Sequence, residues 1–531
     1  AGLVFRHEKF VPASELANVA PWLGALGVGV AVADVDGDGR PDILVTNSRV
    51  GSKSALFINQ GDGTFKDEAE RAGLADLSSG EGALRPLFFD WDNDGRPDLL
   101  LTTTWCVRAF HNEGGGRFRE VTDAAGIRFC GYAVASTALD YDGDGRLDVV
   151  IAGLYPPVRF TRPSTTVVMQ DDIVHADNGG EVAVFHNDGG GRFHRVPGDL
   201  GLKGGGWTMS AASWDFDGDS RPDLYFAVDA NTDRAYLNRG GGRFQDVSAS
   251  LETPDSRQGM NADVATIQGR PAVFVTHVYR PPYLLGFNKL WAFDGAAGGF
   301  KDLPHALGAE DCGWGWGGKF VDLDLDGEPD LVVSNGFISG GRDKDYWPLL
   351  GPLAVAGGRT LADIRNWPPM AGYSLGGYQR DCVFHMQGGR LVDVSNAVGF
   401  AGERSDSRGI AVIDVRGDGR QDLVIGAEGQ PLRFYRDVPP PANAWIGLRL
   451  RGTRSNRDAW GARVTVRLDG RTLERQLWPA NGFMSQSDSG LVFGLGPARR
   501  VRDVTVRWPS GTVQDFGPLP AGRYHSLVER P

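Results

Sequence analysis

Short apolar runs alternate with Gly-, Asn- and Asp-rich segments along most of this 531-residue chain. The first such run is Val28-Gly-Val-Ala-Val-Ala33, and a second, Ile43-Leu-Val-Thr46, follows it after an acidic loop. Runs of about four to eight apolar residues bounded by turn signals are typical of β-strands. Segments with helical periodicity are nearly absent, so the pattern predicts an all-β protein.

Each pair of runs is followed by a hairpin signal, in which an Asn/Gly turn divides two further β runs. The signal occurs at residues 56–65, 110–118, 185–193 and 236–244. A unit of two runs plus a hairpin predicts a four-stranded blade.

The acidic loop between the first two runs of a unit is a nine-residue repeat with aspartates at positions 1, 3, 5 and 9. Carboxylates at this spacing converge when the chain curls, and the carbonyl of position 7 adds another oxygen. Such hard oxygen ligands favour calcium over zinc or copper. The expected ligands of five strong sites and a sixth, weaker one are Asp34, Asp36, Asp38, Arg40, Asp42; Asp90, Asp92, Asp94, Arg96, Asp98; Asp140, Asp142, Asp144, Arg146, Asp148; Asp215, Asp217, Asp219, Arg221, Asp223; Asp322, Asp324, Asp326, Glu328, Asp330; and Asp414, Asp418, Asp422.

Metal-free Asp/Gly turns between strands are the alternative interpretation. Repeated packing of like charges without a counter-ion argues against that alternative. In the sixth copy Arg416 places a cation at a ligand position, which is why we expect a weaker site there.

The loops recur at spacings of roughly 50 to 60 residues with some longer gaps, a period typical of propellers and solenoids. The longest gap holds one further unit, residues 262–276, which aligns with the others on Arg-Pro. It has Val264, Thr266, Gln268 and Ala272 in place of the aspartates. We therefore expect seven blades, one of which has lost its metal.

The last unit has no outer strand after Tyr435, and we expect residues 3–7 to supply it and close the ring. The run Val438-Pro439-Pro440-Pro441 indicates a short, stiff linker over residues 438–442. The sequence thus predicts a seven-bladed β-propeller with calcium-binding blade loops over residues 1–437, and a separate domain over residues 443–531.

The repeats resemble FG-GAP (VCBS-type) repeats, which also form the calcium-loop blades of integrin α-subunits. Beyond the linker, Gly461-Ala-Arg-Val-Thr-Val-Arg467, Ser485-Gln-Ser487 and Val504-Thr-Val-Arg-Trp-Pro-Ser-Gly511 resemble the ASPIC/UnbV domain. The order of the two parts is similar to that in the cartilage acidic protein family. The resemblance implies a small β-sandwich-like C-terminal domain. Two long insertions, at about residues 155–180 and 337–380, depart from it.

The formal charge of −12 gives no evidence of a basic partner, because six bound divalent ions would bring it to about zero. Residues 443–531 contain 14 Arg, no Lys and 7 acidic residues. Guanidinium groups bind carboxylate, sulfate or phosphate; the alternative is an ordinary Arg-rich surface of a chain from a GC-rich genome. No module for nucleic acid is visible, and no apolar run approaches the ~20 residues needed to span a membrane.

The four cysteines lack a Cys-x-x-Cys pattern. We expect Cys106–Cys130 and Cys312–Cys382 disulfides, with free buried thiols as the alternative. Disulfides and millimolar calcium both indicate a secreted or periplasmic protein. The first residue is Ala1 rather than Met, as expected of an exported chain after cleavage.

No catalytic motif is present. His111 and His186 occupy equivalent hairpin positions and are interpreted as strand-surface residues, while His385 lacks a partner motif. The residues that could face a ligand at the channel mouth are Arg85, Trp207, Trp314, Trp316 and Arg408; packing of the tryptophans between blades is the alternative.

Three kinds of function fit these patterns. The first is a calcium-stabilised scaffold that binds a protein or glycan, as part of an envelope or extracellular assembly. The second is a tailoring enzyme with its site at the channel mouth or in the 337–380 insertion, where Asp343, Asp345, Trp347, Trp367 and Tyr373 cluster. The third is an integrin-like adhesion module.

Overall fold

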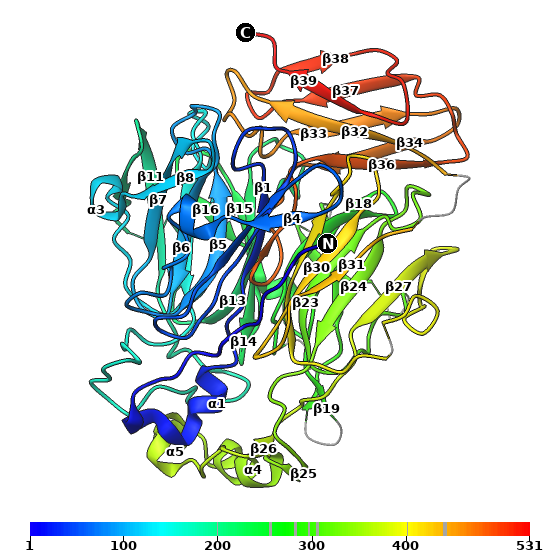
Figure 1. The fold of residues 1–531 in the computed structure, drawn as a ribbon. Coiled ribbons are helices and arrows are strands. Elements are labelled where there is room, and N and C mark those ends of the chain that lie inside the picture. Colours follow the sequence, from blue (N-terminus) through cyan, green and yellow to red (C-terminus); the bar gives the residue numbers. More distant parts are fainter. Residues whose placement is uncertain are drawn as a thin grey trace.

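The computed structural model describes residues 1–198, 200–253, 257–280, 284–295, 298–303, 307–400, 402–438 and 443–531. It is mostly β, and most of its sheets are antiparallel and four-stranded, as predicted (Figure 1). The proposed linker lies mainly outside the described residues. Among those described, no helix is long and apolar enough to cross a membrane.

The sheets before residue 438 follow one another in chain order. Their strands are β1 Val30–Ala33, β2 Asp42–Val45, β3 Ala55–Asn59 and β4 Phe65–Asp67; β5 Ala83–Phe89, β6 Asp98–Thr103, β7 Arg108–Gly114 and β8 Arg117–Glu120; β9 Ala133–Leu139, β10 Asp148–Gly153, β11 Val182–Gly189 and β12 Arg192–Arg195; β13 Trp207–Trp214, β14 Asp223–Asp229, β15 Arg234–Asn238 and β16 Phe244–Asp246; β17 Asp263–Ile267, β18 Arg270–Val275, β21 Lys289–Asp294 and β22 Gly299–Asp302; β23 Gly315–Val321, β24 Asp330–Asn335, β27 Cys382–Gln387 and β28 Arg390–Asp393; and β29 Ser407–Ile413, β30 Asp422–Ala427 and β31 Arg433–Tyr435.

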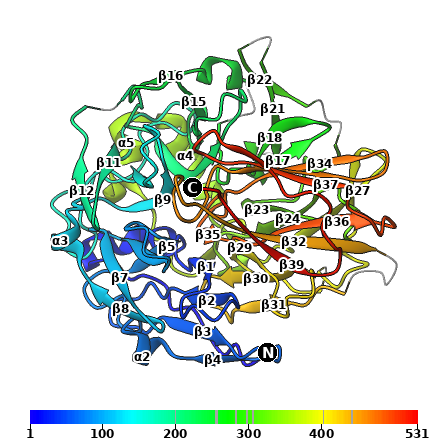
Figure 2. The same ribbon diagram turned by 90° about the horizontal axis from the view of Figure 1, so that it is seen from above.

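The first strand of each sheet lies nearest the centre of the molecule (Figure 2). Strand β1 contacts β5, β5 contacts β9, and the contacts continue through β13, β17 and β23 to β29, which contacts β1 again. These strands are apolar and almost fully buried; β5 and β9 are buried at every position. The sheets therefore share a continuous core that runs around a common axis.

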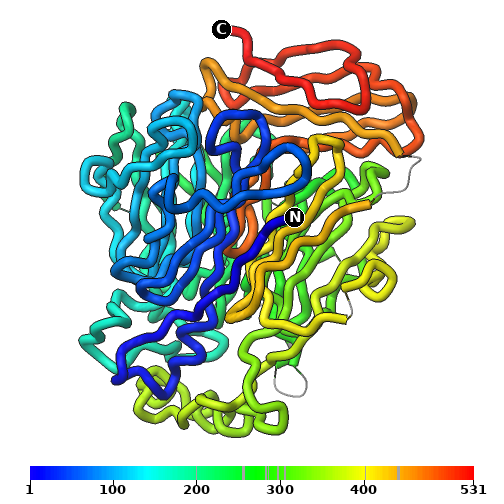
Figure 3. Tube along the Cα trace, in the orientation of Figure 1, coloured from blue at the N-terminus to red at the C-terminus, as the bar shows by residue number. Residues whose placement is uncertain are grey.

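The two ends of this region meet at its edge, where the blue N-terminal segment runs beside the orange strands (Figure 3). The Leu432 N–H donates to the Phe5 carbonyl at 3.0 Å, and the His7 N–H donates to the Gln430 carbonyl at 3.1 Å. Residues 5–7 thus extend the outer edge of the last sheet, beside β31.

Residues 444–531 form two further sheets above the ring (Figure 1). One has the order β36-β32-β39 and the other β34-β33-β37-β38. Their strands are β32 Ala444–Arg451, β33 Arg463–Arg467, β34 Thr472–Gln476, β36 Leu491–Gly496, β37 Asp503–Arg507, β38 Val513–Asp515 and β39 Tyr524–Val528.

A segment of this upper part, residues 479–487, descends into the centre of the ring, and we call it the plug loop. It contains β35, Ser485–Gln486, which pairs in parallel with β1 (Figure 2). Asn481 exchanges two hydrogen bonds with the Ser213 backbone of β13, at 2.9 and 3.1 Å. Gln486 does the same with Phe88 of β5, at 2.7 Å each. The channel is therefore filled by the chain itself.

The close fit of the plug loop explains a glycine on an inner strand. A Cβ at Gly409 of β29 would lie 2.5 Å from the Met484 carbonyl oxygen. A side chain there would push the plug loop away from β29.

The opposite end of the ring is covered by a helical cap, built from residues 14–26 and both insertions (Figure 1). Its elements are η1 Ser14–Val19, α1 Ala20–Leu23, β25 Gly341–Asp345, α4 Trp347–Ala356, α5 Gly358–Ala362, η3 Ile364–Asn366 and β26 Tyr373–Ser374. The two insertions contact each other, since the Val168 N–H donates to the Ala362 carbonyl at 3.0 Å. The remaining short elements are α2 Ala69–Ala72, α3 Thr122–Ala125, η2 Ser248–Leu251, β19 Tyr279–Arg280 and β20 Leu284–Leu285.

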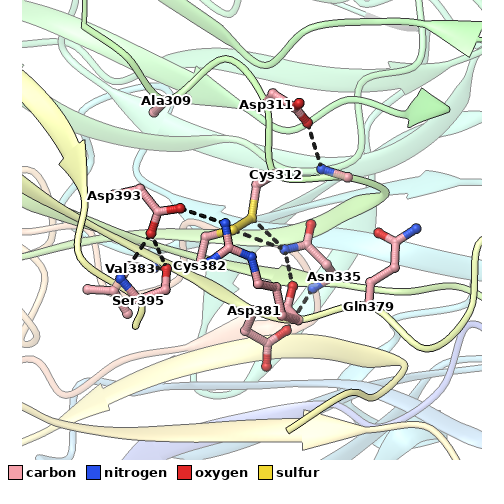
Figure 4. The surroundings of a disulfide bond; sticks show 12 residues. Ala309, Asp311, Cys312, Asn335, Gln379, Asp381, Cys382, Val383, Asp393 and Ser395 are labelled. Atoms are coloured by element: carbon pink, nitrogen blue, oxygen red, sulfur yellow. Dashed lines mark hydrogen bonds and ion pairs between the residues drawn. A yellow bond between two sulfur atoms is a disulfide. The ribbon is translucent and has the colours of Figure 1, made fainter. Parts of the chain in front are cut away.

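Both predicted disulfides are present, Cys106–Cys130 and Cys312–Cys382. Figure 4 shows the second, which ties the segment before β23 to the first residue of β27. The Asn335 side-chain amide donates to Cys312 Sγ at 2.7 Å and to the Arg380 carbonyl at 2.9 Å. The bridge thus fastens the 337–380 insertion at its return to the sheet.

Candidate metal centres

The first aspartate of each loop curls the chain. Asp34 Oδ1 accepts the N–H groups of Gly37 and Asp38 at 2.9 and 3.1 Å, and its Oδ2 accepts the Gly39 N–H at 2.8 Å. The loop at residues 140–148 repeats these bonds from Asp140. Gly39 has φ +86°, a conformation that glycine adopts without steric cost. The same bonding therefore gathers the carboxylates in different blades.

Burial makes these carboxylates costly to ionise without a cation. It raises the pKa of Asp98 to about 9 and the pKa values of Asp42 and Asp148 to about 8. The pKa of Asp90 is raised to about 7, first by burial and then by the nearby Asp458 carboxylate. A divalent ion would reverse this balance by favouring the charged form.

The carboxylates also offer free ligand atoms. Asp98 Oδ2 and Asp322 Oδ1 are buried and have no hydrogen-bond partner among the described residues. Ligand atoms of Asp34, Asp36 and Asp42 lie within 4.8 Å of one another, as do those of Asp90, Asp92 and Asp98. Several of these clusters can hold a metal ion, and the residues fit one.

An asparagine in the hairpin of each of the first four sheets connects neighbouring loops. The Asn112 side-chain amide donates to the Val35 carbonyl of the preceding loop at 2.9 Å and to Pro97 of its own loop at 3.1 Å. Its backbone N–H donates to Asp98 Oδ1 at 2.8 Å. The bond to the neighbouring sheet is repeated by Asn59 to Val415, Asn187 to Trp91 and Asn238 to Tyr141.

Sequence reasoning overlooked this role. The repeated hairpin signal contains all four asparagines, but the pattern identifies them only as turn residues. All four are fully buried, so they belong to the support of the loops.

The arginine-rich upper domain lies directly on the loops. Arg475 donates to Asp322 Oδ2 at 3.2 Å, and Arg463 lies 3.5 Å from Asp215 Oδ2. The Tyr524 hydroxyl donates to Asp414 Oδ2 at 2.9 Å. The abundance of arginine in this domain suggested that it binds an external anion. At least some of these arginines instead contact carboxylates of the same chain.

Two connections differ from the other acidic loops, and both differences are predicted by the sequence: the turn between β17 and β18, and the loop at residues 414–422. Residues Gln268–Gly269 form a two-residue turn between β17 and β18, so the sheet that contains these strands has no acidic loop. In the sixth copy, Arg416 Nε lies 3.1 Å from Asp418 Oδ2. A guanidinium therefore neutralises one of the three expected carboxylates there.

The five residues expected at the channel mouth are all buried. Trp207, Trp314 and Trp316 line an internal cavity of about 20 Å³. Arg408 donates to the carbonyls of Ala25, Gly336, Ser407 and Phe337, and Arg85 donates to Ala480 and Gly482 of the plug loop. These residues form no accessible site, and packing accounts for their positions.

The cluster expected in the 337–380 insertion is divided. Trp347 and Trp367 are buried in the helical cap. Asp345 instead lies at the surface, where it accepts from Arg280 at 2.8 Å. This ion pair borders a pocket of about 280 Å³, the arginine pocket, lined by Arg280, Arg342, Asp345, Ser374, Gly376, Gly377, Tyr378 and Arg404.

Comparison with protein families agrees with the repeats and the loops described above. The FG-GAP-like repeat model matches residues 34–101, 90–151, 169–226 and 215–267, and the ASPIC and UnbV model matches residues 452–531. The chain therefore consists of FG-GAP-like repeats followed by an ASPIC/UnbV domain, and the predicted resemblance is confirmed.

Within this class the chain is a distant homologue of cartilage acidic protein 1. It is 27% identical to the Mus musculus protein over 273 residues, which cover 40% of each chain. It is 25% identical to the Xenopus tropicalis protein over 335 residues, 58% of this chain and 48% of that one. The chain thus spans less than half the length of these relatives.

Solved structures similar to this one are β-propeller proteins. An Agrocybe aegerita lectin that recognises non-reducing terminal N-acetylglucosamine has a TM-score of 0.38 and 22% identity, covering 58% of this chain and 75% of its own. The rhamnogalacturonan lyase YesW has a TM-score of 0.38 and 14% identity, covering 82% and 76%. These likenesses are too distant to carry an argument about function.

Proposed function

We propose that this protein is an exported, calcium-stabilised, seven-bladed β-propeller scaffold that binds a protein or glycan partner. In this proposal, residues 1–437 form the propeller, residues 438–442 form the linker and residues 443–531 form the β-sandwich-like ASPIC/UnbV domain. The observation that carries it is the set of buried aspartate loops beneath the upper domain, with free carboxylate oxygens at Asp98 and Asp322.

Calcium is the ion that suits loops whose ligand side chains are all aspartates. It takes six to eight oxygen ligands at flexible geometry, and each of these loops offers carboxylates and the carbonyl of position 7. Loaded loops would support the neighbouring sheets through the buried asparagines and the upper domain through its arginines. The two disulfides fit an oxidising compartment, where calcium is also abundant.

A scaffold fits the filled channel better than an enzyme does. The plug loop occupies the centre of the ring and the helical cap covers its other end, so little room is left for a substrate along the axis. The arginine pocket is the accessible feature that suits a partner. Among the described residues, neither Arg342 nor Arg404 forms an ion pair, and the Arg342 guanidinium lies 4.3 Å from the ring centre of Tyr378.

In the proposed complex, Arg342 and Arg404 hold a carboxylate or sulfate group of the partner. Guanidinium groups bind such anions through two parallel hydrogen bonds, and the face of Tyr378 can add a stacking contact.

The first experiment is purification from the native source in calcium, followed by a chelator wash and mass spectrometry of what is released. The second applies Arg342→Ala/Arg404→Ala, with Arg128→Ala as a control on a distant exposed arginine. The proposal expects a stoichiometric protein or glycan that the double variant does not retain and the control does. A chain that is isolated alone and also binds no acidic glycan or peptide on an array would overturn it.

A further inference from the structure

Three of the five complete loops have a histidine beside their aspartates. His111, His186 and His385 occupy one equivalent position on the third strand of their sheets, paired with Arg119, His194 and Val392 of the fourth strand. The same position holds Ile58 beside loop 34–42 and Leu237 beside loop 215–223. The chain therefore contains two versions of the loop that differ at one neighbouring side chain.

The imidazoles approach the carboxylates closely. His111 Nε2 lies 3.1 Å from Asp92 Oδ2 and 4.0 Å from Asp94 Oδ2. In loop 140–148, His186 Nδ1 lies 3.1 Å from Asp148 Oδ1 and 3.5 Å from Asp142 Oδ2.

The third loop, 322–330, repeats the arrangement. His385 Nδ1 lies 2.9 Å from Asp330 Oδ1, and its Nε2 lies 4.0 Å from Asp324 Oδ2. In each of the three loops, a ligand atom of the histidine and one from each of two aspartates lie within 4.8 Å of one another. Ligand atoms gathered within this distance can contact a single metal ion.

A second observation separates the two versions of the loop. Each histidine-bearing loop has a buried polar atom without a hydrogen-bond partner: Asp98 Oδ2, His186 Nδ1 and Asp322 Oδ1. Asp98 and Asp322 are at most 1% exposed. Among the described residues, loops 34–42 and 215–223 have no such atom.

His186 is informative because its Nδ1 is close to Asp148 Oδ1 without making a hydrogen bond. When Nδ1 is unprotonated, this nitrogen and the Asp148 carboxylate can bind one cation together. For His111, the other ring nitrogen lies 3.3 Å from Glu113 Oε1. A carboxylate that holds the second nitrogen commonly orients a metal-binding imidazole.

We propose that His111, His186 and His385 are metal ligands, and that loops 90–98, 140–148 and 322–330 are mixed nitrogen–oxygen sites for a first-row transition-metal dication. Loops 34–42 and 215–223 remain calcium sites. Imidazole favours ions such as zinc, iron or nickel, whereas calcium is held by oxygen ligands. This inference rests on the proposed function in one respect, that the loops bind metal.

The test uses the full chain dialysed against millimolar calcium with micromolar Co²⁺. Bound cobalt and calcium are measured by elemental analysis, and proton NMR detects coordinated imidazole as strongly shifted, exchangeable N–H resonances. We expect three retained Co²⁺ ions, and His111→Leu should remove one ion and its resonance. Leucine is chosen because it occupies this position beside loop 215–223. The reverse variant, Ile58→His, should add one Co²⁺.

The possible outcomes separate the two proposals. Calcium binding without retained cobalt, or cobalt that persists in the triple His→Leu variant without shifted imidazole resonances, would overturn the ligand role while leaving the calcium-stabilised scaffold intact. Binding of neither ion would overturn both. Normal calcium stoichiometry in the variants shows that they are folded.

Discussion

The first two strands of a sheet are joined by a tight hairpin between β17 and β18, and by an acidic loop between β1 and β2. Between β17 and β18 the strand pairing continues to Ile267 opposite Arg270, and Gln268–Gly269 close the turn at positive φ, as in a tight hairpin. Between β1 and β2 the pairing stops at Ala33 opposite Asp42. A blade therefore does not need the acidic loop in order to pair its strands.

The difference extends to the contact with the preceding sheet. At the hairpin position of the connecting asparagine, the sheet without an acidic loop has Phe293, which pairs with Phe300. Its ring lies 6.1 Å from that of Phe216, the second residue of the preceding loop. Here an apolar contact replaces the hydrogen bond to the preceding loop. The sheet with loop 322–330 also lacks the asparagine, because Met386 occupies its position opposite Leu391. The asparagine is therefore one way to join neighbouring sheets, and not every acidic loop requires it.

Removing all metal tests this comparison with the largest effect. If the acidic loops need cations and the β17–β18 hairpin does not, a chelator should lower the Tm by tens of degrees. Each calcium site of about 10⁻⁴ to 10⁻³ M affinity contributes roughly 1 to 2 kcal/mol at about 2 mM calcium. Differential scanning calorimetry measures the effect, and added calcium should reverse it. A shift of only a few degrees would mean that the loops fold without metal.

The pH dependence of the chelated protein sharpens the same point. Burial raises the pKa of Asp42 and Asp148 to about 8 and that of Asp98 to about 9 in the folded chain. The unfolded chain releases these protons near pH 4, so chelated protein should lose stability as the pH rises from about 4 to about 8 or 9.

A single carboxyl whose pKa is raised by two units accounts for about 3 kcal/mol of this loss. Urea unfolding at pH 5 and pH 8, with and without added divalent metal, measures it. Metal bound at these loops should abolish or reverse the trend, because the ion favours the charged form. Equal stability at both pH values in chelator would show that burial does not raise the pKa values of these aspartates in the metal-free protein.

Replacing one of the connecting asparagines should cause the next largest loss of stability. Asn112→Ala removes the bond to Val35 of the neighbouring loop and leaves that buried carbonyl unsatisfied. We expect about 1 to 3 kcal/mol of destabilisation, together with weaker calcium binding at loop 34–42. Denaturant melts and calorimetric titration measure both. The exposed Lys66→Ala should change stability by less than about 0.5 kcal/mol; an equally small effect of Asn112→Ala would remove the asparagine from the support of the loops.

The parts of this molecule that the sequence predicts are the repeated and local ones. The aspartate spacing, the Asn/Gly hairpins and the two cysteine pairs all follow from short segments or from comparison of one copy with the next. The ring and its loops could therefore be expected before the structure.

Contacts between distant segments could not be expected in the same way. The sequence predicts that Arg85 faces a ligand, but its partners in the structure are Ala480 and Gly482, almost 400 residues later. The plug loop has no repeat and little pattern of its own, and its contacts are with strands far away in the sequence, such as β1, β5 and β13. His111 and His186 are predicted to be strand-surface residues because Ile58 and Leu237 hold the equivalent hairpin positions, and His385 has no partner motif in the sequence.

The smallest expected effect comes from one carboxylate in one loop. Asp36→Asn should lower the number of bound calcium ions by one. It should also lower the free energy of unfolding by about 1 to 2 kcal/mol at about 2 mM calcium, because it weakens a single site. The matched control is Thr266→Ala, at the corresponding position of the β17–β18 hairpin, which should change neither the stoichiometry nor the stability by more than about 0.5 kcal/mol. Elemental analysis and urea melts in calcium compare the pair. In chelator the difference should vanish or change sign, because the pKa of Asp42 is raised mainly by burial and additionally by the Asp36 charge, and an amide would remove that repulsion. A variant that loses stability equally with and without calcium would show that Asp36 supports the turn itself, and the two hairpins would then differ in their hydrogen bonds and not in their need for metal.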